Sequence, residues 1–286
     1  MSEELTRLLS LLDLEPLEVD YFRGHSPQKS WQRVFGGQVL GQALVAARRS
    51  VEDRSAHSFH AYFLRPGDRR VPILYQVDRT RDGRSFTTRR VIAVQHGEAI
   101  FHMEASFHRE EAGLEHQCAM PDVPEPESLP SWHERMQPLE SKLSDEAREW
   151  LRREPFDVRL VTPVDLVDPG PLPPRLDLWL RVRGELPPDL WLHQCLAAYA
   201  SDLSLIDTMC LPHAIGVLDT GYQFASLDHA MWFHRPFRAD QWLLYSQESP
   251  AAARARGFAC GRLFTREGQL VVSVVQEGLI RPAKPR

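Results

Sequence analysis

The stretch YFLRP at residues 62–66 recurs as WFHRP at residues 232–236, an offset of 170 residues. With the same offset, ILY at residues 73–75 falls on LLY at residues 243–245. Further blocks keep their order along the chain, and the offset drifts only by the one or two residues that loop insertions produce. Ordered self-similarity of this kind marks a repeated structural unit. The sequence therefore predicts two copies of one fold.

Each copy reads as one apolar helix followed by antiparallel strands. The first helix is expected at about residues 37–49, and its small-residue segment 38–47 has a counterpart that begins at Gln194. The segments that follow the first helix are rich in Phe, Tyr, Val, Ile and Thr, which favour strands. Asp82-Gly83 and Glu267-Gly268 are hairpin-turn dipeptides, so the strands should pair antiparallel. The pattern predicts an α+β fold in which the two copies pair edge to edge and cover strand edges that invite aggregation.

A proline-rich segment separates the two copies. Residues 113–175 hold 11 of the chain's 22 prolines, and proline opposes long helices and central strands because it lacks a backbone donor. We therefore expect an N-terminal domain at residues 1–112, a linker at residues 113–175 and a C-terminal domain at residues 176–286. A linker of this length should lie on the surface of both copies.

Composition narrows the class of protein. The chain has 286 residues, of which 43% are hydrophobic and 26% charged, typical of a globular protein with a sizeable core. A net charge of −5 argues against nucleic acid as a partner. No stretch approaches the roughly 20 apolar residues of a membrane span, and the acidic first residues do not resemble a secretory signal, so a cytoplasmic location is expected. The four cysteines lie far apart, without the spacing of a disulfide framework or a zinc site.

Most common catalytic signatures are missing. The sequence contains no G-x-S-x-G, no P-loop, no G-x-G-x-x-G and no H-E-x-x-H. A cysteine nucleophile is conceivable at Cys195 or Cys210, but a structural role in the core is the more common use of such residues.

Three polar residues in apolar surroundings stand out instead. Asp202 follows a stretch without charged residues and continues the helical stripe of Trp191, Cys195 and Ala198. Its carboxylate should be partly desolvated, or turn to solvent at the helix end. Gln276 follows the run LVVSVV, typical of a buried strand, where its amide needs hydrogen-bond partners. Ser226 is expected to begin the strand that leads to Trp232, where a hydroxyl is commonly just turn chemistry.

Several long blocks of sequence resemble one known family. They are FGGQVLGQALVAA (35–47), HSFHAYFLRPGD (57–68), YASDL (199–203), DHAMWFHRPF (228–237), LLYSQES (243–249), ARGFACG (255–261) and VQEGL (275–279). Together they resemble acyl-CoA thioesterase II, a bacterial family related to peroxisomal acyl-CoA thioesterases. The similarity runs from about residue 5 to residue 282. It implies a double hotdog fold, in which two fused copies of an antiparallel β-sheet wrap around a central helix.

The resemblance also implies a catalytic site. Its residues would be Asp202 as the general base, with Ser226 and Gln276 holding the attacking water; neither a cofactor nor a metal is implied. Threonine is the family residue where this chain has Ser226, and both supply a hydroxyl group. The aligned positions of the first copy are Ala46 and Ala105, which cannot form such a site.

The expected partner is a fatty acyl-CoA, which the enzyme would hydrolyse to free fatty acid and CoA in a homodimer or homotetramer. The segment Gly36-Gly37 is a candidate source of an oxyanion donor. Two alternatives stay open. A hotdog hydratase would need an Asp–His pair, but neighbours such as Asp228 and His229 point to opposite faces of a strand. A non-catalytic acyl-CoA-binding protein would use the same apolar tunnel without hydrolysis.

Overall fold

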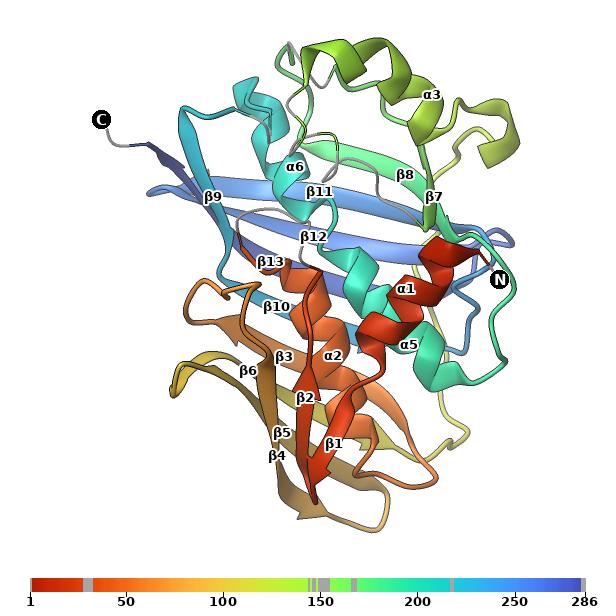
Figure 1. The fold of residues 1–286 in the computed structure, drawn as a ribbon. Helices are drawn as coiled ribbons and strands as arrows, with labels where there is room; N and C mark the ends of the chain where they lie inside the picture. Colours follow the sequence, from red (N-terminus) through yellow and green to blue (C-terminus); the bar gives the residue numbers. More distant parts are fainter. Residues whose placement is uncertain are drawn as a thin grey trace.

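Strand pairing joins the two copies of the repeat into one antiparallel sheet (Figure 1). The structure is a computed structural model that describes residues 2–27, 33–143, 145, 148, 155–165, 169–216 and 219–283. The first copy contains α1 (Glu3–Leu12), β1 (Glu15–Glu18), β2 (Tyr21–Gly24), α2 (Gly36–Arg48), β3 (Ser55–Phe63), β4 (Ile73–Asp82), β5 (Phe86–Gln95) and β6 (Glu98–His108). The second copy contains β8 (Arg175–Val182), α5 (Leu190–Ser201), α6 (Leu205–Cys210), η3 (Leu211–His213), β9 (Tyr222–Ser226), β10 (Asp228–Phe233), β11 (Leu243–Ala253), β12 (Arg256–Thr265) and β13 (Leu270–Pro282).

The seam between the copies is the antiparallel pair β3 and β10. Ala230 lies opposite His60 and Asp228 opposite Tyr62. From this seam outward, the order β3-β6-β5-β4-β2 in one half mirrors β10-β13-β12-β11-β8 in the other. The predicted edge-to-edge pairing is therefore confirmed, and each copy covers one strand edge of the other.

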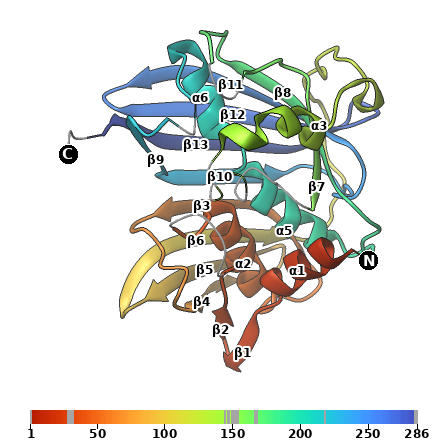
Figure 2. The same cartoon turned by 45° about the horizontal axis from the view of Figure 1, so that its top comes forward.

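Helices α2 and α5 lie side by side on one face of the sheet in both views (Figures 1 and 2). Nearly every residue of α2 is buried, because its small side chains allow close packing. Helix α5 has no charged residue between Leu190 and Ser201 and is almost as deeply buried. Trp191 in its first turn is 37% exposed, so the predicted buried stripe begins only at Cys195. This arrangement is the one expected of an α+β double hotdog.

The predicted hairpin turns are confirmed. Asp82-Gly83 lies between β4 and β5, where the Gly83 N–H donates to the carbonyl oxygen of Phe86 at 2.9 Å. Glu267-Gly268 joins β12 to β13, and Gly268 has a φ of +85° that favours glycine.

The proline-rich segment 113–175 packs against the second copy. It contains η1 (Pro126–Ser128), α3 (Trp132–Met136), η2 (Gln137–Lys142) and β7 (Phe156–Leu160), and β7 pairs with β8. The Trp179 indole N–H donates to the carbonyl oxygen of Pro124 at 2.9 Å. Trp179 and Trp242 belong to a hydrophobic cluster separate from the main core, which Met120 and Val123 help to cover. The described part of this segment therefore shields an outer face of the C-terminal half.

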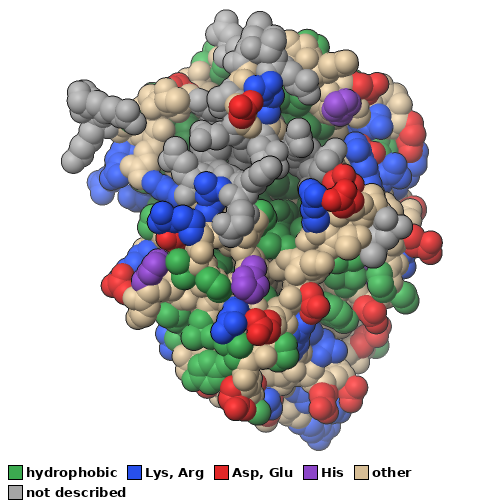
Figure 3. All heavy atoms as spheres, viewed as in Figure 1, with side chains coloured by type: hydrophobic (Ala, Val, Ile, Leu, Met, Phe, Trp, Pro, Cys, Tyr) green, Lys and Arg blue, Asp and Glu red, His purple; other side chains and the backbone are tan. Residues whose placement is uncertain are grey.

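No helix among the described residues is both long and apolar enough to cross a bilayer. Figure 3 shows acidic and basic side chains interspersed over the face of the molecule that carries α1 and α2.

Candidate active site

Asp202 stands where the two central helices meet. It caps the C-terminal end of α5, and its carboxylate accepts a hydrogen bond from the backbone N–H of Gly37 in the first turn of α2. The contact is close, because a Cβ added to Gly36 would lie only 2.5 Å from Asp202 Oδ2. An anion at this position is favoured by the partial positive charge of the α2 N-terminus. One helix from each copy therefore contributes to the surroundings of this carboxylate.

Ser226 and Gln276 join Asp202 in one hydrogen-bonded group. Ser226 Oγ donates to Asp202 Oδ1 at 2.9 Å, and Gln276 Nε2 donates to Ser226 Oγ at 3.0 Å. Gln276 is fully buried on β13, as its apolar surroundings predict. The structure thus brings together all three residues that the sequence singles out.

The predicted strand position of Ser226 is wrong. Ser226 is the last residue of β9 and lies opposite Gly278 on β13, whereas β10 begins only at Asp228. Leu227 separates the two strands and is hydrogen-bonded to both β13 and β3. Its N–H donates to the carbonyl oxygen of Glu277 at 2.9 Å, and its carbonyl oxygen accepts from the N–H of Phe63 at 2.9 Å. The chain can leave β9 and start pairing with β3 because these bonds satisfy the backbone at the break.

Burial sets the electrostatics of Asp202. Desolvation raises the pKa of its carboxyl group from 3.8 to about 6, against the opposing hydrogen bonds from Ser226, Gln276 and the Gly37 backbone. Burial, together with the Asp202 charge, raises the pKa of neighbouring Tyr199 to about 12. The Phe63 ring lies beside Gly36, the glycine that closely approaches Asp202 Oδ2. A carboxyl group with a pKa near 6 is ionised at neutral pH and can accept a proton from water.

The hydrogen-bonded group extends to two residues that sequence reasoning missed. His229 Nδ1 lies 2.6 Å from Gln276 Oε1, and His229 Nε2 lies 2.9 Å from Ser201 Oγ. His229 is fully buried, and desolvation lowers its pKa to about 4, so the ring is neutral. The repeat contained a signal for His229. The offset of 170 residues aligns it with Phe59 of the first copy, so a polar residue replaces an apolar one at this position.

Asp228 points away from His229, as strand alternation predicts. Its Oδ1 accepts a hydrogen bond from the Glu277 N–H at 2.7 Å, and its side chain is half-buried, whereas His229 faces the core. These two neighbours therefore do not form the Asp–His pair that a hydratase would need.

The two candidate cysteines and the arginines of the repeated YFLRP and WFHRP blocks have structural roles. Cys195 and Cys210 are buried, and desolvation raises the pKa of each thiol to about 12, which removes the reactive thiolate. Arg65 donates to the carbonyl oxygen of Ala99 at 2.7 Å, and Arg235 donates to that of Leu270 at 3.0 Å. The repeated Arg-Pro motif thus anchors equivalent hairpins in the two copies.

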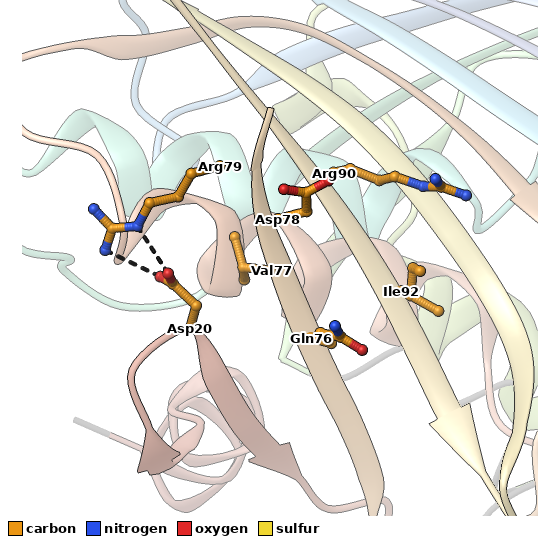
Figure 4. A pocket seen from close by; sticks show the side chains of 7 residues that line it. All are labelled: Asp20, Gln76, Val77, Asp78, Arg79, Arg90 and Ile92. Atoms are coloured by element: carbon orange, nitrogen blue, oxygen red, sulfur yellow. Dashed lines mark hydrogen bonds and ion pairs between the residues drawn. The ribbon is translucent and has the colours of Figure 1, made fainter. Parts of the chain in front are cut away.

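A separate cavity of about 360 Å³ lies at the far side of the N-terminal half. Its lining residues are Asp20, Gln76, Val77, Asp78, Arg79, Arg90 and Ile92 (Figure 4). The Arg79–Asp20 ion pair, at 2.8 Å, closes one side. None of the candidate catalytic residues lines this cavity. Within the described ranges, no group of three or more His, Cys, Asp or Glu side chains is arranged to hold a metal ion.

Family models match both halves of the chain. The model described as acyl-CoA thioesterase matches residues 167–279, and the one described as acyl-CoA thioesterase N-terminal domain matches residues 25–108. Acyl-coenzyme A thioesterase 8 of Rattus norvegicus is 45% identical over 297 residues, which cover 97% of this chain and 89% of that relative.

Solved structures agree with these matches. The acyl-CoA thioesterase II TesB2 from Mycobacterium marinum is 46% identical and superposes with a TM-score of 0.79, covering 96% of this chain and 98% of that one. A hotdog-fold protein from Alicyclobacillus acidocaldarius is only 18% identical, yet it superposes with a TM-score of 0.75 over 96% of this chain and 98% of its own. The latter likeness concerns the fold alone. The predicted double hotdog fold and the predicted family are confirmed.

Proposed function

Because the chain belongs to the acyl-CoA thioesterase family, whose members hydrolyse thioesters, we propose that it hydrolyses fatty acyl-CoA with a water activated by Asp202, Ser226 and Gln276. The observation that carries this proposal is the hydrogen-bonded group that these side chains form beside the first turn of α2.

The proposed reaction needs one proton acceptor and two groups that orient water. The Asp202 carboxylate accepts a proton from the water, whose oxygen forms a bond to the thioester carbonyl carbon. The carbonyl electron pair moves onto oxygen and returns as the carbon–sulfur bond breaks, and Asp202 gives the proton to the departing thiolate. One Gln276 Nε2 hydrogen binds Ser226, and the second faces the Asp202 carboxylate, where it can hold a water that enters beside the base. A general base of this kind contributes about 10²–10⁴-fold.

We propose that the backbone N–H of Gly36 is the hydrogen-bond donor that stabilises the oxyanion. The first N–H groups of a helix have no carbonyl partner within it, and the neighbouring Gly37 N–H is already directed at Asp202. A backbone donor fixed in this way stabilises charge that develops on the carbonyl oxygen. The acyl chain would lie against aromatic rings from both copies, such as Phe35 and Tyr199, whose ring centroids are 5.1 Å apart.

The wider organisation of the protein is part of the same proposal. We assign the N-terminal hotdog to residues 1–112, a linker to residues 113–175 and the C-terminal hotdog to residues 176–286, with β7 of the linker segment added to the C-terminal sheet. We also propose a homodimer or homotetramer and a cytoplasmic location.

A thiol-release assay across acyl-CoA lengths from acetyl to palmitoyl tests the function. We expect free thiol and carboxylic acid in equal amounts for at least part of this series. Crotonyl-CoA separates the alternatives: conversion to 3-hydroxyacyl-CoA without thiol would favour a hydratase. Tight binding of acyl-CoA with no chemistry would favour a binding protein, and either result would overturn the proposal.

A further inference from the structure

A chain of hydrogen bonds runs from the core of the C-terminal half to the candidate base. Its members in order are Ser201, His229, Gln276, Ser226 and Asp202, and the contacts that link them are between 2.6 and 3.0 Å long. The first three side chains are almost completely buried. The proposed reaction uses only the last three members, so the buried histidine behind them needs a separate explanation.

Counting hydrogens fixes the direction of this chain. An ionised Asp202 only accepts, so Ser226 must donate to it and must in turn accept from Gln276 Nε2. Gln276 Oε1 then faces His229 Nδ1, and this contact is a hydrogen bond only if Nδ1 carries the proton. His229 Nε2 is left with a lone pair, which lies 2.9 Å from Ser201 Oγ. The Ala198 carbonyl oxygen also lies 2.9 Å from Ser201 Oγ, so the single hydroxyl hydrogen must turn from that oxygen to Nε2 in this tautomer.

The reversed direction conflicts with an ionised base. If His229 carried its proton on Nε2, its Nδ1 lone pair would repel Gln276 Oε1, and the amide would have to turn over. The Gln276 oxygen would then face Ser226 and draw its hydroxyl hydrogen away from Asp202. The turned amide would also offer the water an acceptor where the reaction needs a donor. The tautomer of His229 is thus tied to the orientation of the Gln276 amide.

The first copy of the repeat serves as an internal comparison. The residues equivalent to the five members of the chain are Val45, Ala46, Ala56, Phe59 and Ala105, all buried and apolar. Phe59 lies opposite Ala105 on paired strands, and its ring stacks on that of His229 with centroids 6.0 Å apart. The fold therefore accepts phenylalanine at this position. His229 and Ser201 are polar only in the copy that also holds Asp202, as expected of residues that belong to the site.

We propose that His229 is a positioning residue, which donates from Nδ1 to Gln276 Oε1 and so holds the amide nitrogen toward Ser226 and the water. In this tautomer the Ser201 hydroxyl donates to Nε2 instead of to the Ala198 carbonyl oxygen. The inference rests on the proposed function, because it assigns His229 a part in the same hydrolysis.

The first test is a double-mutant cycle with palmitoyl-CoA. His229→Phe introduces the residue type that the first copy has at Phe59; it removes the donor but keeps a ring, and we expect kcat to fall about 10- to 100-fold with little change in KM. His229→Asn should recover part of this loss, because its amide N–H can replace Nδ1 as a donor. In a Gln276→Ala background, His229→Phe should change kcat by less than about two-fold, since the group it positions is gone. An equal loss in both backgrounds would overturn the inference.

A matched control shows whether replacing another histidine near the same strands also lowers kcat. His234 follows β10, and its Nε2 lies 2.8 Å from Ser273 Oγ on the same strand as Gln276, outside the chain of hydrogen bonds. His234→Phe should keep the wild-type kcat. A loss equal to that of His229→Phe would contradict a specific role for His229.

The second test needs no substitution. In ¹⁵N-labelled wild-type protein, NMR should show a neutral His229 with its proton on Nδ1 at neutral pH; a proton on Nε2 would overturn the inference even if the variants fail to fold. The two proposals fail differently. Wild-type protein without thioesterase activity would reject the function, whereas an active enzyme in which His229→Phe matches wild type would reject only the positioning role.

Discussion

At the scale of single residues, Asp202 balances burial against hydrogen bonding. Desolvation raises its pKa to about 6, although three donors stabilise the charged form. A general base works only when deprotonated, so kcat/KM should rise with pH through about 6 and then level off. Thiol release measured across this range would check the profile. A rate that stays flat down to pH 4 would mean that another group, or no group, accepts the proton.

The same raised pKa makes the charge costly for folding. The native carboxyl keeps its proton to a higher pH than the unfolded one, so stability falls as pH rises from 3.8 through about 6. Asn carries no charge and avoids this cost. We expect Asp202→Asn to raise the free energy of unfolding by about 1–2 kcal/mol at neutral pH, with no difference near pH 4. This gain is smaller than the full pKa difference implies, because solvent reaches part of the side chain and screens its charge. Urea unfolding at both pH values measures this, and a less stable variant at neutral pH would contradict it.

Residue-level prediction from the sequence succeeded where a polar group interrupts an apolar pattern. Asp202 and Gln276 stand out in this way, and both lie in the hydrogen-bonded group. His229 was not predicted, because the only hypothesis drawn from its strand concerned a pair with its neighbour Asp228. The sequence also did not decide whether Asp202 faces solvent or the interior. Periodicity within one helix does not reveal that the first turn of α2 packs against the end of α5.

At the scale of elements, the site depends on how α2 begins. A Cβ on Gly36 would lie 2.5 Å from Asp202 Oδ2 and 3.1 Å from the Phe63 ring. We expect Gly36→Ala to displace the carboxylate and lower kcat about 10²-fold, with the circular dichroism spectrum unchanged.

Gly41→Ala is the control in the same helix. Its Cβ would meet the end of the Leu12 side chain at 2.9 Å and the Cys195 carbonyl oxygen at 3.3 Å, so it should alter stability but not kcat. Equal kinetic losses in the two variants would show that the effect of Gly36→Ala is not local to Asp202.

Helices and hairpins followed from the sequence, whereas the break between β9 and β10 did not. The expected start of the first helix, residue 37, differs from the observed Gly36 by one residue, because apolar periodicity is strong there. The strand break at Leu227 depends on backbone hydrogen bonds to Phe63 and Glu277, which are distant in sequence. Such long-range pairing leaves no local signal.

At the scale of the whole molecule, the residues of the proposed site come from both copies. Gly36 and Gly37 come from the first copy, whereas Asp202, Ser226 and Gln276 come from the second. The internal repeat predicted that the two copies pair, but the contact of Asp202 with the first turn of α2 appears only in the structure.

Cutting the chain after Gly113, in an exposed segment next to the fully exposed Leu114, tests this dependence. The nicked protein should stay active, because the β3–β10 seam and the α2–α5 contact hold the halves together. The isolated fragment from residue 114 onward should be inactive and self-associate, since it lacks Gly37 and exposes the β10 edge. A fragment that stays monomeric and hydrolyses the substrate at the wild-type rate would contradict the two-copy site.

The most direct measurement is the kcat of Asp202→Asn for palmitoyl-CoA beside that of the wild type. Asn keeps the shape of the side chain but cannot accept a proton from water. We predict a fall of at least about 10²-fold with KM and secondary structure preserved. A variant that hydrolyses the substrate at the wild-type rate would contradict the assignment of Asp202 as the base.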